Sequence, residues 1–462
     1  MLISFTISNY RSFGEEETLT MVASNKITSH PDHRVPIGDT GQFALRSAVI
    51  YGANAAGKSN LVKAIGLGQR LVLNRGDRIR QIEPFGGDEF AGRPSMMEFR
   101  FLIASRVFIY GFDVHVSRVQ SEWLAVIDGD NEVMIFERNE GGDTNICAEA
   151  DAPFPHDRQM GYTLGKLREL PSRKEQLFLN RALAVPEEVL GPTLKSVIDW
   201  FAKDLVVLPA GSRTADLLEK LASEPRLREF CATFLRNVGT GIGDLAFSER
   251  RRPVREWERQ WVEQYVKYGR PAYTYPWGGE DIDVRPIPDD PSAVIERQLV
   301  AAHPVQDNHF ALPFSAESDG TQALLHLLPS IASSADESKV LVLDELDRSL
   351  HPMLTWEFLR FFSESCPGAR KQLIATTHES FLLNQELLRR DEYWFCEKDI
   401  KQLSHIYSLA EFGIRNDLKL QKGYLQGRFG AIPLVGGMQE LERLLECTQA
   451  NESQDAPQDS PT

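Results

Sequence analysis

Apolar and polar residues alternate along the first ten positions of the chain. Ile3, Phe5 and Ile7 are separated by single polar residues, and this period of two predicts a half-buried strand. The same alternation recurs in short runs between about 95 and 137, where residues 128–131 read D-G-D-N and supply turn chemistry. We therefore expect antiparallel hairpins in this part of the chain.

The periodicity becomes helical from about 160 to 245, and residues 250 to 300 are mixed and rich in turn residues. Strand and helix patterns resume at about 308 and continue to about 420. We therefore expect an α/β chain in which residues 1–150 form the N-terminal part of the main domain and residues 306–435 form its C-terminal part. Residues 151–305 are expected to be a helical and mixed insertion. Residues 436–462 are expected to be a short helix followed by a disordered acidic tail.

Composition and charge narrow the classes of protein that fit this pattern. The chain has 462 residues, of which 42% are hydrophobic, and its net charge of −15 disfavours a protein that coats nucleic acid by bulk attraction. The five cysteines are widely spaced, so neither a zinc knuckle nor a disulfide framework is expected. Met1 leads into the first strand without a charged leader, and no run of about 18 apolar residues occurs. We expect a cytoplasmic protein without membrane contact.

The segment from Gly52 to Ser59 reads G-A-N-A-A-G-K-S and lies between a strand pattern and a helical pattern. This spacing and context are those of a P-loop, in which backbone N–H groups and a helix N-terminus bind phosphate. Lys58 is expected to reach the β- and γ-phosphates, and the Ser59 hydroxyl to ligate Mg²⁺. A bare glycine-rich turn would not require Lys-Ser at the helix start. The expected nucleotide-binding residues in this segment are Gly52, Ala53, Asn54, Ala55, Ala56, Gly57, Lys58, Ser59 and Asn60.

A second motif begins at Lys339, where four apolar residues are followed by Asp344 and Glu345. This is the pattern of a buried parallel strand that ends in two acids, the Walker B motif. We expect Asp344 to bind Mg²⁺ and Glu345 to polarise the attacking water, and the P-loop makes the alternative of a simple helix N-cap less favourable. Asp344 lies 286 residues after Lys58, so a large insertion separates the two motifs. No N-K-x-D guanine element occurs, which favours ATP over GTP.

Further motifs surround the acid pair. Residues 315–322 read S-A-E-S-D-G-T-Q before an apolar helix pattern, residues 346–352 read L-D-R-S-L-H-P, and residues 373–378 read L-I-A-T-T-H. Together with K-G-Y-L-Q-G-R-F-G at 422–430, they resemble the ABC-type ATPase heads of the RecF/SMC branch. More narrowly, they resemble the AAA/OLD-like ATPases of bacterial anti-phage and abortive-infection systems, such as the RloA and AriA proteins. The resemblance is strong over about 1–70 and 310–435. It implies a P-loop NTPase fold with a mixed sheet, an antiparallel β subdomain and a helical insertion.

The resemblance also implies roles for individual residues. Ser318 and Gly320 match the signature motif, which in the family contacts the γ-phosphate bound by the opposite protomer, although a plain helix cap would use the same residue types. Asp347 matches the D-loop, and His378 matches the switch histidine that can hydrogen-bond a γ-phosphate. Arg11 matches the N-terminal element whose basic residue approaches the nucleotide. The expected catalytic residues are Lys58, Glu345 and His378.

Two other features leave alternatives open. The segment 250–261 carries five arginines and two tryptophans, with Glu256 and Glu258 among them and Glu249 just before them. It could face nucleic acid, a partner protein or only solvent. The pairs Asp128/Asp130 and Asp281/Asp283 have the spacing of a nuclease metal site. Both precede His378, whereas in the OLD family the nuclease follows the ATPase head, so no fused nuclease is expected.

These observations predict an Mg²⁺-dependent ATPase that forms homodimers or larger assemblies, in which two heads enclose two ATP molecules. It would act as an ATP-dependent switch or sensor for a separate effector, such as a nuclease, in bacterial anti-phage defence. One alternative is a RecF-like DNA repair or maintenance ATPase that binds DNA directly. Another, an ABC transporter subunit, is disfavoured because the L-S-G-G-Q form of the signature is replaced by Ser-Asp-Gly.

Overall fold

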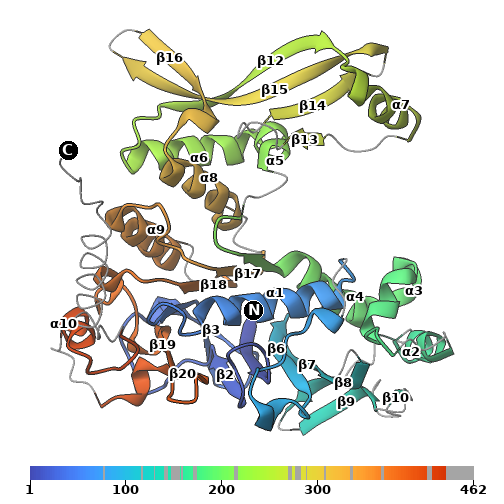
Figure 1. The fold of residues 1–462 in the computed structure, drawn as a ribbon, viewed down its shortest axis with the longest axis vertical. Helices are drawn as coiled ribbons and strands as arrows, with labels where there is room; N and C mark the ends of the chain where they lie inside the picture. The colour runs from blue at the N-terminus through green and yellow to red at the C-terminus, as the bar shows by residue number, and fades with distance from the viewer. Residues whose placement is uncertain are drawn as a thin grey trace, which may run out of the picture.

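The chain folds into two connected bodies, which Figure 1 shows one above the other. The lower body contains a seven-stranded and a six-stranded sheet, and the upper body contains a five-stranded sheet. The computed structural model describes residues 1–75, 79–115, 118–129, 131–139, 144–146, 157, 160–169, 174–212, 217–268, 273–275, 282–287, 289–305, 308–332, 337–365, 369–413 and 419–432.

The seven-stranded sheet is antiparallel and contains the hairpins predicted for residues 95–137. Its strand order is β10-β9-β8-β7-β6-β1-β2. The first strand is buried along almost its whole length, whereas the alternation predicted one exposed face: Ile3 packs with Val35, Ile37 and Ala44, and the Thr6 and Thr18 hydroxyls pair at 2.9 Å across neighbouring strands. Its strands are β1 (Leu2–Ser8), β2 (Glu17–Thr20), β6 (Ser95–Ile103), β7 (Arg106–His115), β8 (Arg118–Asp128), β9 (Asn131–Arg138) and β10 (Thr144–Ile146).

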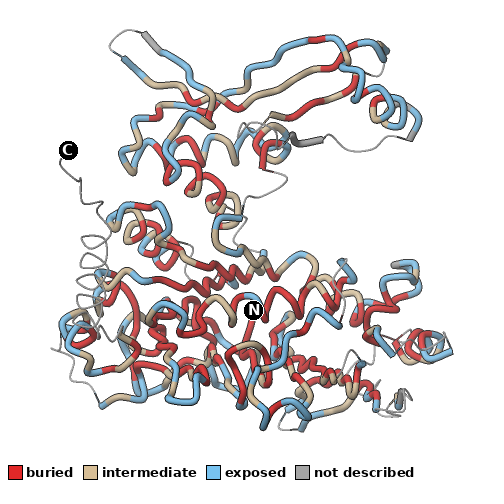
Figure 2. Tube along the Cα trace, in the orientation of Figure 1, coloured by how far each residue is buried: buried red, intermediate tan, exposed pale blue. Residues whose placement is uncertain are grey.

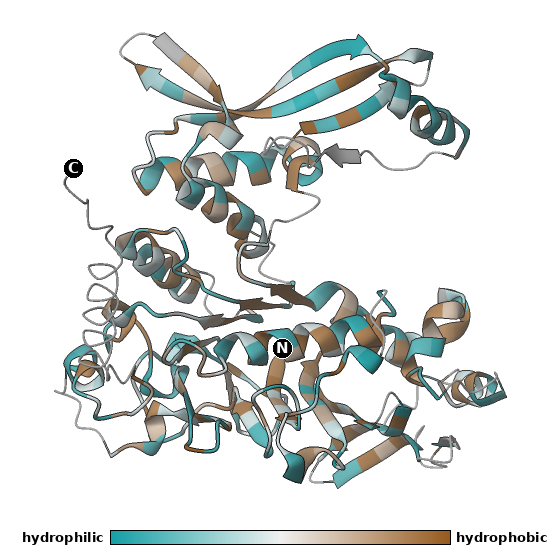
Figure 3. Ribbon diagram, in the orientation of Figure 1, coloured by the Kyte–Doolittle hydropathy of each residue, from teal (hydrophilic) through white to brown (hydrophobic). Residues whose placement is uncertain are grey.

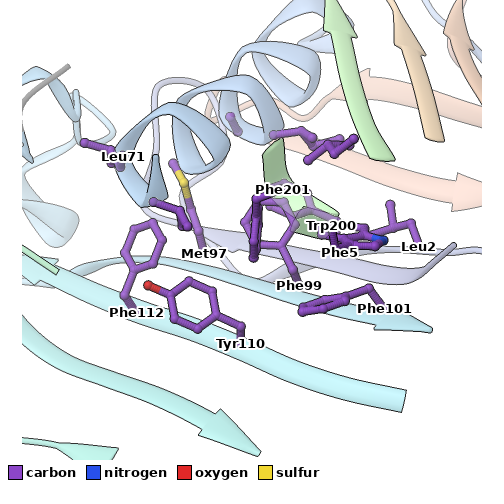
Figure 4. Packing of buried hydrophobic residues seen from close by; sticks show 14 of the residues in the cluster. Leu2, Phe5, Leu71, Met97, Phe99, Phe101, Tyr110, Phe112, Trp200 and Phe201 are labelled. Atoms are coloured by element: carbon purple, nitrogen blue, oxygen red, sulfur yellow. The ribbon is translucent and has the colours of Figure 1, made fainter. Parts of the chain in front are cut away.

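An aromatic core lies against this sheet. Figure 4 shows Phe5, Phe99 and Phe101 of β1 and β6 packed with Trp200 and Phe201 from the insertion. The rings of Phe101 and Trp200 stack with centroids 4.2 Å apart. Burial of such rings is a large apolar contribution to stability. The insertion is therefore part of the same core as the first strand of the chain.

The six-stranded sheet carries both nucleotide-binding motifs. Its order is β11-β17-β18-β5-β19-β20, with all neighbours parallel except the last pair. The strand before the P-loop and the strand before the acid pair are thus separated by one strand, β18. Its strands are β5 (Ser47–Tyr51), β11 (Leu205–Leu208), β17 (Lys339–Leu343), β18 (Lys371–Thr376), β19 (Tyr393–Lys398) and β20 (Ser404–Ser408).

Helices cover both faces of this sheet, as expected for buried parallel strands. Ile50 and Val342 pack in the same cluster as Leu61 of α1 (Lys58–Val72). The alternate residues Tyr51 and Leu341 pack in a second cluster with α8 (Asp319–Ile331) and α9 (Pro352–Glu364). Helix α1 therefore lies on one face of the sheet and α8 and α9 lie on the other, as Figure 1 also shows. Figure 2 shows the strands between them as buried.

The insertion contains more strand than its periodicity predicted. Strand β11 lies inside the segment read as helical and joins the core sheet, and long strands occupy the segment read as mixed. The upper strands are β12 (Asp244–Pro253), β13 (Tyr273–Tyr275), β14 (Ile282–Ile287), β15 (Asp290–Val305) and β16 (Asn308–Pro313). The helices are α2 (Met160–Glu169), α3 (Glu187–Leu190), α4 (Pro192–Asp199), α5 (Leu217–Ser223), α6 (Pro225–Asn237) and α7 (Arg259–Tyr268). In Figure 3, β12 in the upper body is largely hydrophilic, whereas β17 of the core sheet in the lower body is hydrophobic.

Two small elements complete the described fold. A two-stranded sheet pairs β3 (Arg34–Pro36) with β4 (Phe43–Leu45). The short helix α10 (Leu420–Leu425) contacts the segment after β18, where Gln421 Nε2 donates to Ser380 Oγ at 3.4 Å. Across the described residues, no helix is both long and apolar enough to cross a bilayer. Residues 433–462, which include the predicted tail, lie outside the described residues.

Candidate functional site

The P-loop connects β5 to α1 and places Lys58 at the first helical position. Its Nζ atom donates to the carbonyl oxygens of Gly52 at 2.7 Å and Ala53 at 3.0 Å. Ala55 and Gly57 have positive φ angles of 64° and 122°, which turn the backbone around the helix N-terminus. The loop therefore surrounds the ammonium group with backbone polar groups at the positive end of a 15-residue helix.

Residues from the last two strands of the sheet support the P-loop from behind. The Ser404 hydroxyl donates to the Ala56 carbonyl at 2.5 Å, and the Cys396 thiol donates to the same oxygen at 3.3 Å. A Cβ added at Gly57 would collide with the Ser404 side chain, and one added at Gly52 would collide with the Cys396 carbonyl. The two glycines are thus required by close packing on β19 and β20. No sequence motif pointed to Cys396 or Ser404, because their contacts with the P-loop follow from strand order.

The two motifs meet at the carboxyl ends of β17 and β18. Ser59 Oγ donates to Asp344 Oδ1 at 3.1 Å, across 285 residues of sequence. Thr376 Oγ1 donates to the same carboxylate oxygen at 2.7 Å and accepts from the Glu345 backbone N–H at 2.8 Å. Thr376 forms part of the T-T-H motif, but the residue pattern alone did not assign it to the site.

Glu345 follows Asp344 in a left-handed backbone conformation, with φ of 55°. Its carboxylate lies 3.6 Å from the Arg348 guanidinium. Both side chains are exposed, so the pair is worth little as a source of stability. A cavity of about 250 Å³ adjoins Glu345 and Arg348, and Asp319 and His326 of α8 also line it. The acid pair can therefore be reached from the α8 side of the sheet.

His378 and Asp347 lie beside this acid pair. The His378 backbone N–H is 3.3 Å from an Asp347 carboxylate oxygen. Burial lowers the pKa of the His378 imidazole below 6.5, and the charge of Lys58 lowers it further, against the opposing effect of the nearby carboxylates. The lowered pKa favours the neutral imidazole at neutral pH. Burial also lowers the pKa of the Lys58 ammonium.

The residues predicted to form the signature, Ser318 and Gly320, lie at the start of α8, on the face of the core sheet opposite to α1. Ser318 caps α8, because its Oγ accepts from the Thr321 backbone N–H at 3.2 Å. A Cβ added at Gly320 would collide with the Ser349 carbonyl oxygen. Gly320 therefore packs against the segment that follows the acid pair, while the P-loop helix α1 packs on the opposite face of the sheet.

The N-terminal element lies next to the P-loop helix. Asn60 Nδ2 donates to Ser12 Oγ at 2.8 Å. The neighbouring Arg11 directs its guanidinium toward Glu83, with Nε and Oε2 3.1 Å apart, and has a positive φ of 52°. The structure therefore brings Ser12 to the loop, whereas Arg11 pairs with a carboxylate.

The residues present fit a nucleotide with Mg²⁺. Lys58 and the loop amides supply the cation and donors that polyphosphate requires. Ser59 and Asp344 supply a hydroxyl and a carboxylate, the oxygen ligands that Mg²⁺ uses together with substrate phosphates. The described residues hold no cluster of three His, Cys, Asp or Glu side chains suited to a metal.

The remaining candidate features are far from this site in the fold. Arg250–Arg252 lie on β12, and Trp257, which is 58% exposed, lies in the 3-10 helix Glu256–Glu258 just before α7. Arg252 is buried between Glu258, at 2.7 Å, and Glu296. Asp128 ends β8, while Asp283 on β14 pairs with Arg285 at 2.7 Å. Their D-x-D partners, Asp130 and Asp281, lie outside the described residues.

Comparison with known proteins identifies a family. A family model described as "AAA domain, putative AbiEii toxin, Type IV TA system" matches residues 47–151 and 225–384. Among solved structures, the SMC head bound to the C-winged helix domain of ScpA has a TM-score of 0.39 and 13% identity, covering 88% of this chain and 97% of that one. The SMC head domain from Thermotoga maritima has a TM-score of 0.35 and 12% identity, covering 88% and 98%. Comparison with curated protein sequences finds no match.

Proposed function

This chain belongs to the AAA-domain family described for AbiEii-type toxins, and from that premise we propose that it binds ATP with Mg²⁺ and hydrolyses it. The fold is that of a P-loop NTPase of the ABC type. One observation carries the proposal: Ser59 Oγ at the start of the P-loop helix lies 3.1 Å from Asp344 Oδ1 at the end of β17. A P-loop hydroxyl and a strand-end acid are the pair of protein ligands expected beside a Mg²⁺–phosphate group.

The proposed reaction assigns a task to each residue of the site. Lys58 neutralises the β- and γ-phosphates, and bound Mg²⁺ supplies further charge neutralisation. The Glu345 carboxylate orients the attacking water and accepts its proton as the water oxygen bonds to the γ-phosphorus. The bond from that phosphorus to the bridging oxygen breaks, and ADP and phosphate are the products. His378, whose lowered pKa favours the neutral imidazole, is available to hydrogen-bond a γ-phosphate oxygen.

We further propose that two copies assemble around the nucleotides. Ser318 and Gly320 lie at the start of α8, on the face of the core sheet opposite to α1. If these residues contact the γ-phosphate, as the family resemblance implies, that phosphate is bound by a second copy. ATP would then hold a homodimer or a higher assembly together, and hydrolysis would release it.

The biological role we propose is an ATP-dependent switch that controls a separate effector, such as a nuclease, in bacterial anti-phage defence. The family description supports an abortive-infection context, because AbiEii toxins are named in it. The alternative, a RecF-like ATPase that binds DNA directly, is favoured by exposed Trp257 between exposed Arg255 and Arg259. It is opposed by the net charge of −15 and by carboxylates that pair with Arg251 and Arg252.

Binding of a fluorescent ATP analogue tests the nucleotide site. Lys58→Ala should abolish binding, because the loop loses its cation and its amides cannot offset the phosphate charge. Lys63→Ala removes an exposed cation from the same helix and should bind as the wild type does. Wild-type affinity in Lys58→Ala would contradict the P-loop assignment.

A further inference from the structure

Thr376 lies at the end of β18, between the P-loop strand and the strand that carries the acid pair. Its side chain is fully buried. The ladder between β17 and β18 ends at Leu343 and Ala375. The Asp344 N–H donates to Leu208 on the β11 side, so the next N–H that faces β18 is that of Glu345, which lies beyond the last pair of this ladder. The Thr376 hydroxyl accepts from this N–H at 2.8 Å and replaces the missing carbonyl.

The same hydroxyl also fixes the first acid. Thr376 Oγ1 donates its proton to Asp344 Oδ1 at 2.7 Å. Because a hydroxyl has one proton and two acceptor lone pairs, it can serve both acids at once. Asp344 Oδ1 accepts from Ser59 as well, so Thr376 and Ser59 hold that oxygen from β18 and from α1.

Glu345 needs this support because its backbone is strained. A positive φ of 55° is costly for a residue with a Cβ, and such a conformation persists where surrounding contacts impose it. Three hydrogen bonds define the turn: Glu345 N–H to Thr376 Oγ1, Leu346 N–H to Thr376 O at 2.9 Å, and Arg348 N–H to Glu345 O at 2.9 Å. Two of the three end on Thr376.

From these contacts we infer that Thr376 is the positioning residue for both acids of the proposed ATPase site. It holds Glu345 in the backbone conformation that directs its carboxylate, and it fixes the carboxylate oxygen of Asp344 beside Ser59. This inference rests on the proposed function, because it assigns Thr376 a role in the same reaction. Hydrogen bonds to charged groups contribute enough to change rates by about 10- to 100-fold when they act in the transition state.

The test compares variants that differ by the hydroxyl. Thr376→Val keeps the β-branched shape and removes the donor and acceptor. We expect the full chain with this change to bind a fluorescent ATP analogue in EDTA within about twofold of wild type, since Lys58 and the loop are intact. Its kcat should fall about 10- to 100-fold, and the Mg²⁺ concentration for half-maximal activity should rise. Thr376→Ser should restore both values.

Thr355→Val is the matched control. Thr355 is also fully buried, but its hydroxyl has no hydrogen-bond partner among the described residues, so this variant should keep wild-type kcat and Mg²⁺ response. If Thr376→Val does not fold, the Thr376→Ser and Thr376→Ala pair provides the same contrast. A Thr376 variant without the hydroxyl that retains wild-type kcat and Mg²⁺ response overturns the inference. Wild-type nucleotide affinity in Lys58→Ala overturns the proposed function instead, and the two failures are therefore distinguishable.

Discussion

The fold buries the Lys58 side chain even without a bound nucleotide. Burial lowers the pKa of its ammonium, while the charges of Asp344, Asp347 and Glu345 act in the opposite direction. Two loop carbonyls accept its protons at 2.7 and 3.0 Å. Phosphate oxygens can replace these neutral acceptors with charged ones, which form stronger hydrogen bonds. The residue is therefore positioned in advance, and binding exchanges its partners.

Glu345 is the residue whose change should separate binding from turnover. Glu345→Gln keeps Asp344 and Ser59 in place but removes the proton acceptor, so we expect unchanged ATP affinity and turnover slowed about 100-fold or more. The variant should also accumulate as an ATP-bound dimer or larger assembly. Steady-state ATPase assays and light scattering with ATP measure the two effects.

Glu386→Gln, a change at an exposed carboxylate, serves as the control and should behave as the wild type in both assays. Glu345→Gln could instead show normal turnover and a molecular mass that ATP does not change. That result would mean that Glu345 only shapes the turn after β17.

At the scale of elements, the contact between α8 and the segment after β17 deserves a direct test. Gly320→Ala would place a Cβ against the Ser349 carbonyl, a backbone atom that cannot turn aside as a side chain can. We expect a cost of about 1–3 kcal/mol in the free energy of unfolding, typical of overpacking. ATPase activity should fall as well, because Ser349 lies four residues after Glu345. Thermal unfolding and ATPase assays on the same samples measure both.

Gly165 in helix α2 is a glycine at which alanine should stabilise the protein rather than destabilise it. A Cβ added at Gly165 meets nothing within 4 Å, so Gly165→Ala should stabilise the protein by about 0.4–1 kcal/mol through the unfolded chain. Equal effects of the two substitutions would show that α8 and the acid segment are not tightly packed in solution.

Elements whose function requires particular residue types at consecutive positions could be predicted from the sequence. Elements that depend on pairing with residues far away in the sequence could not. The P-loop and the β17 acid pair are consecutive residues whose types the chemistry requires, so their spacing alone predicts them. Strand β11 escaped prediction because four apolar residues within a helical pattern do not reveal that they pair with β17. Strand β12 escaped because charged residues 249–252 interrupt its alternation at a sheet edge. Thr376, Cys396 and Ser404 became visible only once strand order was known.

At the scale of the whole molecule, the upper body extends away from the nucleotide site and presents charged and aromatic residues. Arg251, Arg255 and Arg259 lie there on β12 and the following helical segment. We expect their combined reversal to Glu to weaken capture of an effector, or of DNA under the alternative function, while ATP binding stays unchanged. A pull-down with neighbouring gene products and with duplex DNA at about 150 mM salt measures this, since salt at that level screens weak attraction between exposed charges.

Reversal of Lys166, Lys195 and Lys203 in the helical part of the insertion provides a control of equal charge change. Capture of DNA by the wild type without any protein would favour the DNA-binding function. Equal loss of capture in both triple variants would indicate a general electrostatic effect and would remove the upper body as the docking region.

The order of strands in the core sheet has a consequence for synthesis of the chain on the ribosome. Strand β5, which ends in the P-loop, has both of its neighbours, β18 and β19, in residues 371–398. The P-loop therefore emerges early but stays without its sheet until most of the chain has been translated, and closing such distant contacts is slow. A nascent or prematurely terminated chain would display the phosphate-binding sequence without a working site. The chain can therefore bind ATP only after β18 and β19 have both been translated.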